Sequence, residues 1–202
     1  PLPSEEGRFS EHAIPEIMAR LERCDACLIG CGMGQSPAGL ALVRAALSQT
    51  RCPVVLDADG INVLAGHIDV LRGAACPVIV TPHEGEFRRL FGDYAGTRLA
   101  AAKEFYAQTG ATLLLKGHRS LIVGADGCYV NRCGNPGMAT GGSGDVLAGI
   151  VTALLGQGLS PTRAAAAAAW LHGTAGDLCA AELGEYGMLP SDLLLRLPRL
   201  LR

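Results

Sequence analysis

The chain has 202 residues, of which 49% are hydrophobic, and its formal net charge is -2. This length suits one domain with a well-filled core. The charge excludes the basic footprint of a nucleic-acid binder, and no apolar run reaches the about 20 residues that a membrane helix needs. Without a secretory signal in these residues, we expect a single domain over residues 1–202 in the cytoplasm, with small-molecule partners and neither nucleic acid nor membrane.

The chain contains eight cysteines. In a chain of this length we expect free thiols in a reducing compartment rather than a disulfide framework. Cys24 and Cys27 form a CxxC motif with Cys31 after it, but no second Cys or His pair completes a four-ligand metal site. The motif is therefore interpreted as structural, and no metal ligand is assigned.

Apolar runs alternate with turn residues from the N-terminus to about residue 120, a pattern typical of an α/β protein. Residues 1–10 are polar and are expected to form a loop. Predicted helices lie at 11–23, 37–48, 84–91 and 97–109, with short helical pieces at 61–64 and 69–71. Predicted strands lie at 26–29, 53–56, 77–80 and 112–115. This order indicates a mostly parallel sheet with helices on both faces.

The pattern changes after residue 120. Residues 121–123 and 128–131 flank a turn at 124–127 that carries glycine, which predicts a hairpin and hence an antiparallel edge of the sheet. A helix is expected at 146–155. Another begins with Ser160 as its cap and runs to His172 through six alanines, which allow a neighbouring helix to approach closely. A last helix is expected at 191–201.

Residues 135–145, which join the hairpin to the helix at 146–155, include four glycines and a proline. A glycine-rich turn that leads into a helix leaves the first N–H groups without partners and aims the helix dipole at one point, which favours an anion such as phosphate. Asp145 ends this turn, and a carboxylate repels phosphate. It is therefore either a base that takes a proton from an attacking hydroxyl or only the cap of the helix.

Polar and glycine residues also follow each predicted parallel strand, at the sheet edge where open α/β sheets bind ligands. Lys116 there either neutralises a nucleotide phosphate or lies on the surface. Asp57 and Asp59 either hold Mg²⁺ through waters, accept ribose hydroxyls, or cap the next helix. His83 either contacts a polar substrate or is structural.

Three further candidates receive a structural interpretation. His118 and His172 are expected to be structural or peripheral. Ser143 is not expected to be a nucleophile, because its neighbours lack the GxSxG turn between a strand and a helix.

Six segments follow one another along the chain: GCGMG at 30–34, DADGIN at 57–62, TPHEGE at 81–86, Lys116 with Gly117, NPGMATGGSGDVLAG at 135–149 and LHGTAGD at 171–177. In this order they resemble the ADP/ATP-dependent NAD(P)H-hydrate dehydratases of the ribokinase-like superfamily. The resemblance implies a ribokinase-like three-layer fold. It also implies a further N-terminal segment that precedes residue 11 in the family and is absent from this sequence, so we expect the domain to be incomplete at that end.

The same resemblance implies the activity: removal of water from the S epimer of hydrated NADH or NADPH by phosphorylation of the ring hydroxyl and elimination of phosphate. ADP would give AMP, with ATP as the less favoured co-substrate, and Mg²⁺ and a homotetramer are expected. Asp145 would be the catalytic base. An anion hole would comprise Gly142, Ser143, Gly144 and Asp145. The nucleotide would contact Lys116, Gly117, His118, Arg119, Ser120 and Gly144. The hydrated dinucleotide would contact Gly32, Gly34, Asp57, Asn62, His83 and Asp145.

Two other functions remain open from the sequence. One is a small-molecule kinase of the same fold, of the hydroxyethylthiazole or hydroxymethylpyrimidine type, although the NPGMATGGSGD and TPHEGE segments together point away from it. The other is an inactive nucleotide-binding protein, if the absent segment is essential.

Overall fold

The computed structural model describes residues 4–5 and 8–201. Its centre is a six-stranded sheet in the order β3-β4-β5-β6-β7-β8. The strands are β3 (Cys27–Ile29), β4 (Val54–Leu56), β5 (Val78–Val80), β6 (Thr112–Leu115), β7 (Leu121–Gly124) and β8 (Gly127–Val130). The first four are parallel, whereas β7 and β8 are antiparallel to their neighbours. The predicted mostly parallel sheet with an antiparallel edge is confirmed.

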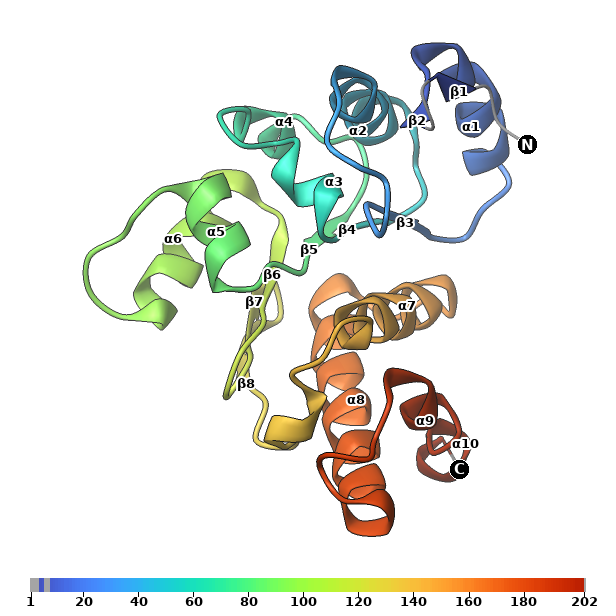
Figure 1. The fold of residues 1–202 in the computed structure, drawn as a ribbon. Helices are drawn as coiled ribbons and strands as arrows, with labels where there is room; N and C mark the ends of the chain where they lie inside the picture. The colour runs from blue at the N-terminus through green and yellow to red at the C-terminus, as the bar shows by residue number, and fades with distance from the viewer. Residues whose placement is uncertain (1–3, 6–7, 202) are drawn as a thin grey trace.

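Helices cover both faces of the sheet, as predicted (Figure 1). Those on one face are α2 (Pro37–Gln49), α3 (Asp59–Asn62), α4 (Asp69–Arg72), α5 (Glu84–Phe91) and α6 (Arg98–Thr109), with α1 (Ile14–Leu21) at the β3 end. On the other face lie α7 (Ser143–Gly156) and α8 (Pro161–Leu183), followed by α9 (Pro190–Leu194) and α10 (Leu197–Leu200). Short 3₁₀ turns occupy Glu11–Ala13 and Pro136–Met138.

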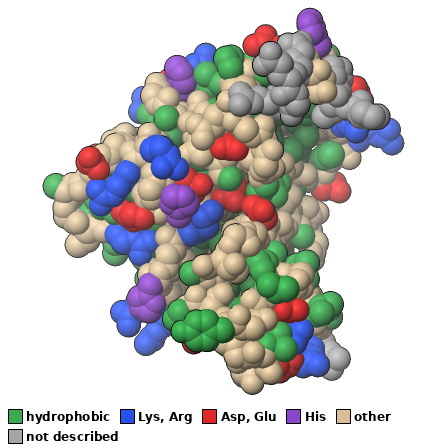
Figure 2. Space-filling view, viewed as in Figure 1, with side chains coloured by type: hydrophobic (Ala, Val, Ile, Leu, Met, Phe, Trp, Pro, Cys, Tyr) green, Lys and Arg blue, Asp and Glu red, His purple; other side chains and the backbone are tan. Residues whose placement is uncertain are grey.

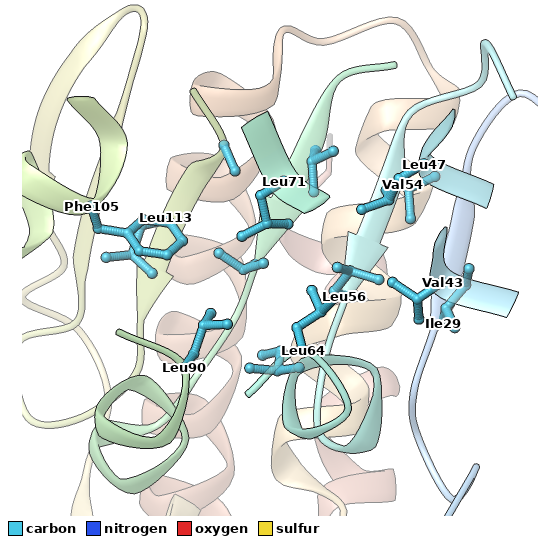
Figure 3. Close-up of a cluster of buried hydrophobic side chains, with 14 of the residues drawn as sticks. Ile29, Val43, Leu47, Val54, Leu56, Leu64, Leu71, Leu90, Phe105 and Leu113 are labelled. Atoms are coloured by element: carbon cyan, nitrogen blue, oxygen red, sulfur yellow. The ribbon is translucent and has the colours of Figure 1, made fainter. Parts of the chain in front are cut away.

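The alternation of side chains along each strand divides the interior into two cores. Val54 and Leu56 face the α2–α6 layer, and Figure 3 shows them packed with Val43, Leu47 and other apolar side chains of that layer. Val55, between them, belongs to the second core with α7 and α8. Because both faces are covered, the central strands are apolar throughout, which is how the sequence distinguishes them from a half-exposed sheet.

The alanines of α8 bring this helix close to α7, as predicted. Ala164, Ala165 and Ala168 are fully buried in the same core as Val151 and Leu154 of α7. The helix continues beyond His172 to Leu183, which is further than predicted.

Two local predictions were wrong. Within residues 1–10, β1 (Ser4–Glu5) pairs antiparallel with β2 (Arg8–Phe9) instead of forming a loop throughout. The last helix is divided into α9 and α10, because Pro198 lacks an N–H group and cannot continue the hydrogen bonds of the preceding turn. Among the described residues, no helix is both long and apolar enough to cross a bilayer.

Candidate functional site

The loops that follow β3, β4, β5 and β6 meet at one edge of the sheet, as predicted. Gly30 and Asp57 are so close that a Cβ atom at Gly30 would lie 1.8 Å from the Asp57 carbonyl oxygen, and Gly30 has a φ of +135°. At the next pair of strands, the N–H group of Lys116 donates to the carbonyl oxygen of Pro82 at 2.8 Å. Backbone contacts of this kind hold the predicted site segments in one cluster.

Asp57 is the buried acid at the centre of this cluster. Its side chain is 2% exposed, and its Oδ1 atom accepts from Lys116 Nζ at 2.7 Å and from Thr81 Oγ1 at 2.8 Å. Lys116 Nζ also lies 3.8 Å from Glu86 Oε2. The Lys116 ammonium therefore lies inside the site, between two carboxylates, and the surface interpretation of this lysine is wrong.

The first turn of α7 lies directly beside this ion pair. A Cβ atom at Gly144 would be 3.4 Å from Lys116 Nζ and 3.9 Å from Asp57 Oδ2. Ser143 already donates its N–H group to the Thr140 carbonyl oxygen at 3.2 Å. The N–H groups of Gly142, Gly144 and Asp145 have no acceptor among the described residues and are free for an anion, with the N-terminal end of the α7 dipole behind them.

Asp145 does not cap this helix. The capping residue is Gly142, with a φ of +92°, and that end has no hydrogen bond from a capping side chain. Asp145 is exposed, and its carboxylate lies together with the Cys31 thiol and the Asp57 carboxylate, with their ligand atoms all within 4.8 Å of one another. The capping interpretation is therefore wrong, and the carboxylate faces the cluster at its solvent-open side.

The Cys31 thiol was not singled out as a site residue by the sequence, because nothing local places it next to Asp145. Burial raises its pKa to about 12, and a hydrogen bond to Asp145 and the charges of Asp57 and Asp145 act in the same direction. The thiol is therefore protonated at neutral pH and can donate to a carboxylate.

Ser143 and His172 form a buried contact behind the anion-binding turn. Ser143 Oγ lies 3.3 Å from His172 Nε2, and both residues are buried. Burial lowers the pKa of His172 to about 4, while the Ser143 contact opposes this shift and the Lys116 charge adds to it. The neutral imidazole joins α8 to the first turn of α7, which confirms the structural interpretation of His172 and keeps Ser143 away from any substrate.

His83 caps α5, which gives it a structural role. Its Nδ1 atom accepts from the N–H groups of Gly85 at 3.0 Å and Glu86 at 3.3 Å, while Glu86 Oε2 accepts from the His83 N–H group at 2.8 Å. Since Nδ1 is the acceptor, the proton of the neutral ring is on Nε2. The side chain is 56% exposed, and its Nε2 atom lies 3.6 Å from Glu86 Oε1.

Asp59 binds the glycine-rich loop at residues 30–34 instead of capping a helix. Its Oδ2 accepts from the N–H group of Gly34 at 2.9 Å, and its Oδ1 accepts from Gln35 at 3.2 Å and from Asn62 at 3.3 Å. The residue that caps α3 is Ala58, and no side chain caps that end through a hydrogen bond, so the capping interpretation of Asp57 and Asp59 is wrong. Asp59 thus brings Gly34 and Asn62 together.

Position 32 favours glycine because of its backbone conformation, and not because neighbouring atoms leave no room for a side chain. Its φ is +68°, and a Cβ atom there would meet nothing within 4 Å. Open space above this turn leaves its backbone accessible to a ligand.

Arg98 binds the backbone of the predicted nucleotide loop, residues 116–120. The sequence did not predict this contact. Arg98 donates to the carbonyl oxygens of Lys116 at 3.2 Å, Leu115 at 3.4 Å and His118 at 3.3 Å. Its Nε atom lies 3.3 Å from Glu84 Oε2. The position of Arg98 at the start of a helix does not indicate this role in the sequence, because the carbonyl oxygens that it binds come from another segment.

The loop itself has a tight backbone. Gly117 has a φ of +150° and a Cβ atom there would lie 3.2 Å from the Arg98 guanidinium. Ser120 Oγ donates to the Gly117 carbonyl oxygen at 3.1 Å, and His118 and Arg119 are exposed, Arg119 with a φ of +57°. Figure 2 shows acidic, basic and histidine side chains interleaved from the left side of the molecule, where α5 and α6 lie in Figure 1, to its centre.

The chain is similar to known proteins over almost its whole length. A family model described as NAD(P)H-hydrate dehydratase matches residues 4–199. The chain is 45% identical over 201 residues to the bifunctional NAD(P)H-hydrate repair enzyme of Moorella thermoacetica, covering 97% of this chain and 38% of that protein. It is 40% identical over 195 residues to the ADP-dependent (S)-NAD(P)H-hydrate dehydratase of Neisseria meningitidis serogroup B, covering 89% of this chain and 66% of that protein.

The chain is also similar to a solved structure of an NAD(P)H-hydrate dehydratase. The ADP/ATP-dependent NAD(P)H-hydrate dehydratase of Bacillus subtilis, co-crystallised with ATP and Mg²⁺, superposes with a TM-score of 0.77 at 31% identity, covering 96% of this chain and 78% of that one. The fold is ribokinase-like, because a ribokinase-like superfamily protein of Enterococcus faecalis V583 superposes with a TM-score of 0.80 at 32% identity, covering 94% of this chain and 67% of that one. The chain spans 38% of the length of the Moorella relative and 66% of that of the Neisseria relative.

Proposed function

The chain belongs to the NAD(P)H-hydrate dehydratase family, and we propose on that basis that its single ribokinase-like domain restores NADH and NADPH from their S hydrates. The observation that carries the proposal is the meeting of a free carboxylate, Asp145, with free N–H groups of α7 and the Lys116 ammonium. A base, an anion hole and a cation at one point are what the transfer of a phosphoryl group to a hydroxyl requires.

The proposed reaction has two steps. Asp145 takes the proton of the ring hydroxyl as that oxygen attacks the terminal phosphoryl group of the nucleotide, and the free N–H groups of Gly142, Gly144 and Asp145 stabilise the charge that develops. Electron release from the ring nitrogen then expels phosphate, which is a far better leaving group than hydroxide, and loss of a proton to solvent from the adjacent ring carbon restores the ring double bond. The products are the intact reduced cofactor, phosphate and the shortened nucleotide.

The remaining predicted contacts fall into two groups around this centre. The loop at 116–120, fixed by Arg98, would receive the nucleotide. Gly32, Gly34, Asn62 and His83, whose backbone pairs with that of Lys116, would receive the hydrated dinucleotide. We propose ADP as the co-substrate, giving AMP, because the Neisseria relative is named for ADP dependence.

Mg²⁺ fits this site as a companion of the nucleotide phosphates, held through waters. Both oxygens of Asp59 are already occupied, and Oδ1 of Asp57 accepts two hydrogen bonds, so these acids do not provide a set of direct oxygen ligands. When bound, Mg²⁺ would neutralise charge on the phosphates.

The assembly and compartment are also proposed. Large apolar side chains are exposed on the C-terminal elements, which supports a homo-oligomer such as a tetramer. They are Leu183, Tyr186, Leu189, Leu194, Leu195 and Leu201. All eight cysteines are free, as predicted, which supports a reducing cytoplasm.

The test is to incubate the protein with hydrated NADH and either ADP or ATP while following nicotinamide absorbance and free phosphate. A dehydratase yields both signals, a kinase yields a stable phosphorylated product, and an inactive binding protein yields neither. We expect Asp145→Asn to lower kcat by about 10²- to 10⁴-fold, the usual contribution of a general base, with nucleotide binding retained. The matched control is Asp69→Asn, in the first turn of α4, and unchanged turnover in the Asp145 variant would refute the base assignment.

A further inference from the structure

Cys31, Asp57 and Asp145 bring three donor atoms together from three separate elements. Cys31 follows β3, Asp57 follows β4 and Asp145 lies in the first turn of α7. Their ligand atoms lie within 4.8 Å of one another, and Cys31 Sγ is 3.8 Å from Asp57 Oδ2. For a zinc ion with bonds of about 2.3 Å to sulfur and about 2.0 Å to oxygen at tetrahedral angles, the expected separation of these two atoms is about 3.5 Å.

Asp57 contributes a buried oxygen that lacks a strong partner. The side chain is 2% exposed, and Oδ1 takes both the Lys116 and the Thr81 hydrogen bonds. Among the described residues, Oδ2 accepts only from the Cys31 thiol, at 3.8 Å, and a thiol is a weak donor. Buried carboxylate oxygens are normally well satisfied, so this one points to a ligand in the space between Cys31 and Asp145.

The charged side chains around that space are mainly acidic. Asp57, Glu86 and Asp145 bring three carboxylates to the cluster, and the ammonium that lies among them is that of Lys116, 2.7 Å from Asp57 and 3.8 Å from Glu86. Negative charge is therefore in excess. Lys116 occupies Oδ1 of Asp57, on the side of Glu86, whereas Oδ2 faces the Cys31 thiol and the first turn of α7.

We propose that Cys31, Asp57 and Asp145 form a binding site for a thiophilic divalent cation, best fitted by Zn²⁺, with water at the fourth position. Mg²⁺ takes oxygen ligands and does not use sulfur, whereas Zn²⁺ accepts one sulfur and two carboxylate oxygens. On binding, the Cys31 S–H proton leaves to solvent as the Zn–S bond forms and one water leaves the ion, with no change of oxidation state.

Occupation of this site would also regulate the enzyme. A zinc ion bound to the Asp145 carboxylate removes the base, so Zn²⁺ would inhibit the dehydratase until a chelator withdraws it. This consequence rests on the proposed function, whereas the binding of the ion does not.

The test is an equilibrium titration of the full chain with Zn²⁺ alone, in competition with a chromophoric chelator. We expect one site per chain, weakened by about 10- to 100-fold in Cys31→Ser and in Asp145→Asn, the range that the loss of even an outer-shell partner produces. Cys128→Ser, at an exposed thiol in β8, and Cys24→Ser, in the CxxC motif, are the controls and should bind as tightly as the native chain. Far-ultraviolet circular dichroism would verify that each variant is folded.

A second measurement identifies the sulfur ligand directly. Co²⁺ in place of Zn²⁺ should give a thiolate-to-metal charge-transfer band that disappears in Cys31→Ser and persists in both cysteine controls. The proposal is overturned by the absence of zinc binding, by unchanged affinity in Cys31→Ser, or by loss of the band in a control. A chain that binds zinc at Cys31 but does not repair hydrated NADH after a chelator has removed the zinc would refute the proposed function and leave the zinc site standing.

Discussion

Replacing Lys116 by methionine should strongly destabilise the protein, because it leaves the Asp57 carboxylate buried without its cation. The two charged groups are 2.7 Å apart, with side-chain exposures of 19% for Lys116 and 2% for Asp57. At that separation and an effective dielectric constant of about 20, the Coulomb attraction is about 6 kcal/mol. Thr81 still donates to Asp57 in the variant, so we expect a net loss near the usual value for breaking a buried pair, about 3–5 kcal/mol.

The assay is urea unfolding at neutral pH, with Asp57→Asn and the double variant Lys116→Met/Asp57→Asn measured in parallel. Removing both charges should restore most of the loss, because the carboxylate that remains unpaired in Lys116→Met is the cause of the destabilisation. Lys103→Met, on α6, is the matched control for the loss of a lysine. A loss below about 1 kcal/mol in Lys116→Met, the value for an exposed pair, or a double variant no more stable than the single one, would refute this reasoning.

Three further outcomes are expected. Gly30→Ala should lower the melting temperature sharply, because its Cβ atom would lie 1.8 Å from the Asp57 carbonyl oxygen at a φ of +135°. Gly66→Ala, at a position with a positive φ but open space around it, should lower the melting temperature much less. Equal decreases in the two variants would contradict the steric argument. Arg98→Ala should raise KM for the nucleotide more than it lowers kcat, because the carbonyl oxygens of the 116–120 loop lose their hydrogen-bond donors. Added guanidinium should partly reverse the effect. A change in kcat alone would contradict a positioning role. The buried His172 ring has a pKa of about 4, against 6.5 when exposed, so the unfolded chain binds this proton more readily than the folded one. The free energy of unfolding should therefore fall as the pH drops from about 6.5 to 4, by up to about 3 kcal/mol. Unfolding curves of His172→Gln should lose this part of the pH dependence, and an unchanged dependence would show that another group causes it.

The sequence was sufficient for the sheet and for the place of the site. Apart from α8, which continues to Leu183 instead of ending at His172, the main strands and helices were predicted to within a few residues. Apolar periodicity, glycine, proline and helix caps act over a few neighbouring positions. Strand ends of a parallel sheet share one edge, so the polar segments after β3, β4, β5 and β6 could be expected to meet. The exceptions, the small N-terminal strand pair and the divided last helix, involve segments of two to five residues whose local signal is weak.

What the side chains do within that edge was decided by the tertiary structure. Lys116 pairs with Asp57 across two strands, Arg98 binds the carbonyls of a loop that begins beyond the next strand, and Cys31 lies beside Asp145. These contacts join positions far apart in the chain, and they depend on strand register and on side-chain direction, neither of which a local pattern encodes. Residue types and their order determined which groups are present at the site, whereas the packing of β3, β4, β6 and α7 determined which of them touch.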